Sequence, residues 1–154
     1  MKDRQQTIME LLDGYETIVK KAKDAGFITT KNFLGDIVET LVCSKINADK
    51  CNASQKGFDA LRNKERIQIK FRSRNKKDKY KITFKNVTET EIGFDTLAFC
   101  CQNDEGYDIY EIKVEDFPDT QFKEEKKHRV LFLDDIFLKK NKIKKHQIKG
   151  ANKT

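Results

Sequence analysis

The stretch GFDALRNKERIQIKFRS, residues 57–73, constrains the fold more than any other segment of the chain. Its second half alternates apolar and polar residues from 66 to 72, which is the period of a strand with one buried face. A shorter apolar segment over 58–61 precedes it, and an asparagine between the two tolerates the positive φ of a tight turn. The sequence therefore predicts a β-hairpin with a two-residue turn at Asn63–Lys64.

The register of this hairpin determines which side chains share a face. With the predicted turn, Asp59 lies opposite Gln68, and Gly57 lies opposite Lys70. Opposed Cβ atoms are roughly 4.5–5.5 Å apart and point to the same face. Asp59, Gln68 and Lys70 therefore converge on one side, while the apolar residues take the other. A slip of one residue would send Asp59 to the opposite face.

The converging polar side chains have two interpretations. They can be the solvated face of an ordinary hairpin, without chemistry. Alternatively, the carboxylate of Asp59 and the amide oxygen of Gln68 suit a hard cation such as Mg²⁺, which prefers oxygen ligands. The ammonium group of Lys70 would then stabilise developing negative charge or orient an attacking water. A further carboxylate from a preceding helix, that of Glu39, would complete the ligand set.

The remaining apolar patterns predict a mixed domain. Helical spacing predicts one helix over residues 5–25, ended by Gly26, and a second that follows Thr30 and carries Glu39 at the edge of its apolar face. Four further segments are predicted as strands, the last as a strand or a helix start: 80–84, 94–102, 107–114 and 128–134. The predicted fold class is α/β or α+β, with a central mixed, largely antiparallel sheet flanked by helices.

Positive charge is concentrated in two segments of a chain whose net charge is +7. Residues 62–81 carry a local balance of +8 and residues 139–153 carry +7, which leaves −8 for the rest. Such a distribution indicates a polyanionic partner, although a single lysine-rich segment is more often a solvated face. We expect one domain over residues 1–138 and a basic tail over residues 139–154 that is mobile or ordered only on nucleic acid.

Composition and cysteine placement argue against other classes. No apolar run approaches the ~20 residues of a membrane span, and the N-terminal segment lacks the apolar stretch of a signal peptide. The cysteines at 43, 51, 100 and 101 form no CxxC pair, which argues against a zinc site. We therefore expect a cytoplasmic protein with reduced thiols and no membrane partner.

The segments ETLV, SQKGFDA and RIQIKFRS together resemble the PD-(D/E)xK nuclease superfamily, which has the restriction-endonuclease-like fold. Glu39 matches the helical glutamate of the family pattern, Asp59 the strand aspartate, and Gln68-Ile69-Lys70 the acid-x-lysine pair. The later segment over 93–113 resembles the next core hairpin of the family, so that the resemblance covers residues 33–113.

The resemblance implies a DNA endonuclease of the restriction or repair type that depends on Mg²⁺ or Mn²⁺. Glu39, Asp59, Gln68 and the Ile69 carbonyl would bind the metal, and Lys70 would stabilise the transition state or the attacking water. On analogy, cleavage of two strands also implies a homodimer. Six residues around the hairpin would contact DNA or its phosphates: Ser54, Lys56, Arg72, Arg74, Lys76 and Lys77.

Gln68 is the main departure from the family pattern, because it replaces an acidic residue. Glutamine offers an oxygen at nearly the same reach but removes one negative charge, so metal affinity should fall. The alternative function is therefore a catalytically weak or inactive module of the nuclease fold that binds nucleic acid. A third alternative is a structural or regulatory subunit whose basic tail docks on an acidic protein.

Overall fold

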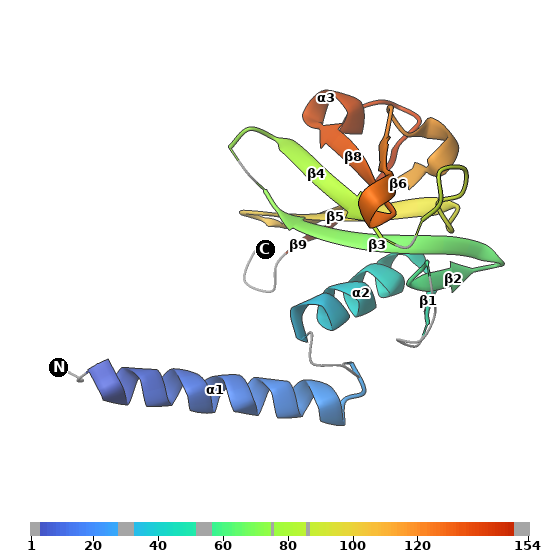
Figure 1. The fold of residues 1–154 in the computed structure, drawn as a ribbon. Coiled ribbons are helices and arrows are strands. Elements are labelled where there is room, and N and C mark those ends of the chain that lie inside the picture. Colours follow the sequence, from blue (N-terminus) through green and yellow to red (C-terminus); the bar gives the residue numbers. More distant parts are fainter. Residues whose placement is uncertain (1–3, 28–32, 52–56, 75, 86, 150–154) are drawn as a thin grey trace.

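The computed structural model describes residues 4–27, 33–51, 57–74, 76–85 and 87–149, and Figure 1 shows their arrangement. Three α-helices and nine β-strands lie in these ranges, together with two short 3₁₀ turns. The elements are α1 (Arg4–Asp24), α2 (Phe33–Ile46), β1 (Asp49–Lys50), β2 (Ala60–Arg62), β3 (Glu65–Ser73), β4 (Lys79–Phe84), β5 (Thr96–Asn103), β6 (Gly106–Lys113), β7 (Gln121–Lys123), β8 (His128–Asp134), α3 (Asp135–Leu138) and β9 (Lys144–Lys149). Both predicted helices and all of the predicted strands are present, although Thr30 lies outside the described residues.

The hairpin of β2 and β3 confirms the predicted turn and register. Asn63 and Lys64 both have positive φ, 49° and 72°, the combination that a two-residue turn between twisted strands requires. Leu61 pairs with Arg66 and Ala60 with Ile67, which is the predicted register. The hairpin could be predicted because the turn and the alternation are both local properties of the sequence.

The central sheet has six strands in the order β1-β2-β3-β5-β6-β9. Only β3 and β5 are parallel, and the other neighbours are antiparallel. The sheet is therefore mixed and largely antiparallel, as the sequence predicts. Six of the eight residues of β5 are buried, because both faces of this inner strand are covered.

The two faces of the central sheet are covered by different elements (Figure 1). Helix α2 packs on one face, where Val38 and Val42 meet Ile67, Ile69 and other sheet residues. A separate antiparallel sheet, in the order β4-β8-β7, packs on the other face together with α3. The predicted packing of a helix on the sheet is thus present on the α2 face, whereas strands and the short helix α3 cover the second face. The segment over 80–84 is a strand, but it belongs to this covering sheet.

The basic C-terminal segment differs from its prediction. The sequence predicts a tail over residues 139–154 that is mobile or ordered only on nucleic acid, but Lys144–Lys149 forms β9 and pairs antiparallel with β6 along the edge of the central sheet. His146 Nε2 lies 2.5 Å from Glu111 Oε2, so this strand contributes a partly buried polar contact. The domain therefore extends to residue 149, and residues 150–154 lie outside the described part.

The four cysteines are free, and Cys43, Cys100 and Cys101 are buried. Burial raises the pKa of the Cys100 thiol to about 12, so this residue is a structural thiol rather than a nucleophile.

In the described part of the chain, no helix is long and apolar enough to cross a membrane.

Candidate metal and nuclease site

Asp59 is bound to β3 through one of its two carboxylate oxygens. Its Oδ2 accepts a hydrogen bond from Gln68 Nε2 at 2.7 Å and another from the backbone N–H of Ile69 at 2.8 Å. Because a carboxylate oxygen can only accept, the NH₂ end of the Gln68 amide faces Asp59. Both of these hydrogen bonds go to Oδ2, and none of the described residues donates to Oδ1 of Asp59.

Gly57 determines how the chain approaches Asp59. Its φ is +86°, and a Cβ at this position would lie 3.4 Å from the carbonyl oxygen of Gly93. Glycine adopts this backbone conformation without strain, and its lack of a side chain permits the close contact with Gly93. The close contact places the segment before β2 against the loop that leads to β5, and Asp59 follows two residues later.

Asp59, Gln68 and Lys70 line one cavity of about 190 Å³, together with Phe84, Lys85 and neighbouring apolar residues. Lys70 Nζ lies 5.8 Å from the centroid of the Phe84 ring. Burial lowers the pKa of Lys70, and although the negative charge of Asp59 raises it, burial outweighs this effect. The predicted convergence of these three polar side chains is thus present, in a cavity that also contains the exposed ammonium group of Lys85.

Glu39 lies beside this cavity rather than in its lining. Its Oε2 is 3.9 Å from Lys50 Nζ, and the same ammonium group donates a hydrogen bond to the carbonyl oxygen of Asp36 at 3.1 Å. Burial and the negative charge of Asp59 raise the pKa of Glu39 to about 7. Burial also raises the pKa of Asp59. The two carboxylates are therefore close enough to repel each other, and both are partly removed from water.

Lys50 is a site residue that the sequence analysis missed. It stands in β1, a two-residue strand within a segment that the sequence describes only as a polar loop. Its ammonium group compensates the carboxylates of Glu39 and Asp36, at 3.9 Å and 3.6 Å. No local pattern distinguishes this lysine from its neighbours in sequence, because its role depends on the pairing of β1 with β2.

The donor atoms at this site are of the type that Mg²⁺ and Mn²⁺ bind. They are the carboxylates of Asp59 and Glu39, the amide oxygen of Gln68 and the Ile69 carbonyl, all of them oxygens. The N–H of Ile69 points toward Asp59, and in an antiparallel strand the carbonyl of the same residue points the same way. Among the described residues no group of three or more His, Cys, Asp or Glu could hold a metal ion. In the structure the NH₂ group of Gln68 faces Asp59. Binding of a metal ion by these oxygens would therefore require the Gln68 amide to turn, so that its oxygen faces Asp59.

The raised pKa of Glu39 predicts a stability effect that metal-free protein should show. In the unfolded chain Glu39 titrates near 4.5 and in the folded protein near 7, so its ionisation destabilises the fold increasingly as the pH rises between these values. We expect Glu39→Gln to stabilise the metal-free protein by roughly 2–3 kcal/mol at about pH 8 and by little at about pH 4. Urea denaturation at both pH values, in EDTA, measures the difference.

The control for this prediction is Glu115→Gln, which changes an exposed glutamate. Its effect should stay within ~0.5 kcal/mol at both pH values. If Glu39→Gln stabilises the protein equally at both pH values, or destabilises it at the higher one, the pKa of Glu39 is not raised in the folded protein.

The residues expected to contact DNA have different environments. Ser54 and Lys56 lie outside the described residues. Arg72 donates hydrogen bonds to two backbone carbonyls, those of Phe71 at 2.7 Å and Lys81 at 3.3 Å, and thereby links β3 to β4. Arg74 forms an ion pair with Asp78 at 3.1 Å, and Lys76 and Lys77 are exposed in the turn between β3 and β4.

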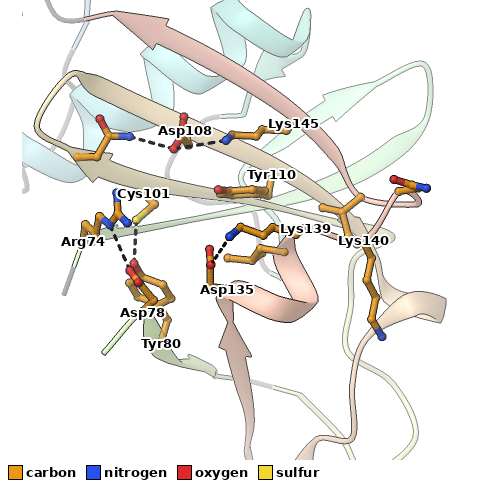
Figure 2. Close-up of a pocket in the computed structure, with 14 residues that line it drawn as sticks. Arg74, Asp78, Tyr80, Cys101, Asp108, Tyr110, Asp135, Lys139, Lys140 and Lys145 are labelled. Carbon is orange, nitrogen blue, oxygen red and sulfur yellow. Dashed lines mark hydrogen bonds and ion pairs between the residues drawn. The ribbon is translucent and has the colours of Figure 1, made fainter. Parts of the chain in front are cut away.

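A larger cavity of about 500 Å³ lies at the C-terminal ends of β3 and β5, and Figure 2 shows its lining. Tyr80, Cys101 and Tyr110 contribute to this lining, and Cys101 Sγ donates a hydrogen bond to Tyr80 Oη at 3.3 Å. Three ion pairs within it neutralise most of the charge: Arg74–Asp78 at 3.1 Å, Lys139–Asp135 at 2.8 Å and Lys145–Asp108 at 3.9 Å. Because these charges are already paired, the cavity favours neither an anionic nor a cationic ligand.

Comparison with family models and with curated proteins finds no match for this sequence. A function for the protein is therefore inferred from the side chains around Asp59 and from the charge of the surrounding strands.

Proposed function

We propose that the protein is a metal-dependent DNA endonuclease with a restriction-endonuclease-like core, and that Asp59, Gln68 and Lys70 form the centre of its active site. The observation that carries the proposal is the shared cavity, in which a carboxylate, an amide and a partly desolvated ammonium group lie together. Two features outside the cavity support it. Glu39 offers a second carboxylate beside Asp59, and residues 62–81 carry a charge balance of +8.

The residues have distinct roles in this proposal. Asp59 Oδ1, Glu39, the Gln68 amide oxygen and the Ile69 carbonyl would hold Mg²⁺ or Mn²⁺, which supplies an activated water and polarises the phosphate. Lys70 stabilises the negative charge that develops on the phosphate oxygens. Lys85, Lys76 and Lys77 are exposed and contact the DNA backbone, which gives affinity without sequence information.

The test is cleavage of supercoiled plasmid DNA by the purified protein. We expect nicked and linear products with Mg²⁺ or Mn²⁺, and no products in EDTA. Intact plasmid under every metal condition, in a protein preparation that still binds the DNA, would contradict the endonuclease function and support the second candidate.

The second candidate is a module of the same fold that binds nucleic acid without cleaving it. The observation that favours it is the hydrogen bond from Gln68 to Asp59. In this bond the NH₂ group of Gln68 occupies the position that a cation would take beside the carboxylate. Such a module would bind DNA with a strong dependence on salt and no dependence on divalent metal.

The substitution Gln68→Glu separates the two candidates. A carboxylate at this position adds a negative charge to the ligand set, so we expect Mn²⁺ to bind roughly tenfold more tightly or better. If the wild type is a nuclease, cleavage by the variant rises by a similar factor from a measurable level. Cleavage that appears only in the variant would identify the natural protein as a binding module, and Gln121→Glu on the exposed strand β7 is the matched control.

A further inference from the structure

Helix α1 exposes a continuous apolar stripe. Of the eight large apolar side chains that are exposed in the described part of the protein, five lie on this helix: Ile8, Met9, Leu11, Tyr15 and Ile18, with exposures between 47% and 69%. Scattered apolar residues on a surface are ordinary, but a contiguous stripe indicates an interaction surface. A single amphipathic helix also gains most of its stability from the packing of its apolar face.

The C-terminal end of α1 contacts the rest of the domain. Phe27, just after the helix, has a backbone carbonyl that accepts a hydrogen bond from Thr40 Oγ1 of α2 at 3.3 Å. Ala22 in the last turn is 7% exposed, whereas Leu11 is 69% exposed. Figure 1 shows the rest of the helix projecting away from α2 and from the central sheet. The side chains of Ile8, Leu11, Tyr15 and Ile18 are therefore about half exposed or more along this part of the helix.

The sequence of α1 is complementary to itself in the reversed direction. Tyr15 is the centre of this symmetry, because Leu11 and Val19 stand four positions to either side of it. Glu10 and Lys20 each stand five positions away and have opposite charges. Two antiparallel copies centred on Tyr15 would therefore align the apolar stripes and place Glu10 of each copy opposite Lys20 of the other. Two parallel copies would place like charges opposite each other, which is unfavourable.

Gly14 gives a second reason to expect that another helix crosses α1 closely beside Tyr15. Glycine within a helix costs about 1 kcal/mol relative to alanine. Apart from the neighbouring residues and backbone of its own helix, no atom of the described chain lies within 4 Å of the position that its Cβ would take. The chain itself therefore does not require a glycine here. A second helix that crosses beside Tyr15 would use the space, since a small residue allows helix axes to approach and leaves room for the partner's tyrosine ring.

We propose that α1 is a homodimerisation helix that pairs antiparallel with α1 of a second copy of this chain. The interface is isologous: the stripe of Ile8, Leu11, Tyr15 and Ile18 forms its core, and Glu10 of each copy pairs with Lys20 of the other. The proposal does not depend on nuclease activity, because it rests on the exposure, symmetry and charge of α1 alone.

Sedimentation equilibrium of the full-length protein tests this association. We expect a dimer for the wild type and a monomer for the double variant Leu11→Glu, Ile18→Glu. These side chains are 69% and 55% exposed, so the variant should keep the unfolding midpoint of the domain. A wild type that stays monomeric up to its solubility limit, whether or not it binds anionic lipid vesicles, overturns the proposal. A variant that remains dimeric also overturns it.

A charge exchange tests the antiparallel orientation. Glu10→Lys alone or Lys20→Glu alone should weaken the dimer about tenfold, because each places like charges opposite each other twice in the symmetric interface. The combination of both substitutions should restore the wild-type dissociation constant. If the combined variant is no tighter than the single variants, the antiparallel pairing is wrong.

Discussion

Asp59→Asn should lower Mg²⁺-dependent DNA cleavage by at least ~10³-fold. Two donors hold one oxygen of this carboxylate, the Gln68 amide at 2.7 Å and the Ile69 N–H at 2.8 Å. An asparagine must therefore direct its own oxygen toward these donors. Its NH₂ group then occupies the position of Oδ1, where a cation needs an oxygen. The variant that loses cleavage activity should also lose Mn²⁺ binding at this site.

The control substitution is Asp119→Asn, which removes the same charge from an exposed position. It should leave cleavage within about twofold of the wild type. Burial raises the pKa of Asp59, because the ionised carboxylate is partly removed from water in the metal-free fold. The asparagine variant should therefore be at least as stable as the wild type. If this variant is folded and retains cleavage, Asp59 is not in the active site.

Glu111→Gln should destabilise the protein by about 3 kcal/mol near neutral pH. The side chain of Glu111 is 7% exposed and accepts a hydrogen bond from Arg62 Nη2 at 2.6 Å on one oxygen. The other oxygen lies 2.5 Å from His146 Nε2. A glutamine of the same size keeps one acceptor oxygen and turns an NH₂ group toward one of these partners. It also removes the charge that compensates the partly buried Arg62.

The effect of this substitution should depend on pH. Burial alone would raise the pKa of Glu111, but hydrogen bonds from Arg62 and His146 outweigh burial, and the folded-state pKa is lowered. A lowered carboxylate pKa contributes stability above the unfolded-state value of about 4.5, and this contribution is lost as the pH falls through the folded-state value. The stability difference between Glu111→Gln and the wild type should therefore shrink in acid.

Asp95→Asn is the matched control, since it breaks an exposed ion pair between Arg66 of β3 and Asp95, the residue before β5. Arg66 and Asp95 are 3.1 Å apart, with side chains 40% and 46% exposed, and such pairs contribute less than ~1 kcal/mol. Equal effects of the two substitutions in urea denaturation would mean that Glu111 is not the buried link between β2 and β9. The prediction thus also tests whether the C-terminal segment belongs to the fold.

The hairpin was predictable because each of its determinants is local. The alternation from Arg66 to Arg72 and the turn at Asn63 lie within a few residues of each other, and together they determine which side chains face Asp59. The position of β9 was not predictable in this way. Its sequence KKHQIK has one aliphatic residue, and one of its side-chain contacts joins His146 to Glu111, 35 residues earlier.

The candidate site was also predicted only in part. The register places Gln68 beside Asp59 and Lys70 on the same face, because neighbouring positions on two paired strands are fixed by the turn. The ion pair of Glu39 with Lys50 depends on how α2 and β1 approach each other. Likewise, Lys85 reaches the cavity because β4 crosses to the covering sheet. Non-local contacts of this kind leave no periodic signal in the sequence.

Anomalous diffraction from crystals soaked in Mn²⁺ measures most directly whether Asp59 and Gln68 share a divalent cation. The expected result is a peak at roughly 2.1 Å from Asp59 Oδ1 and from the Gln68 amide oxygen, with the amide turned away from its hydrogen bond to Oδ2. Crystals that take up Mn²⁺ elsewhere, or not at all, while Gln68 Nε2 still donates to Asp59 would contradict a metal-dependent active site in this cavity.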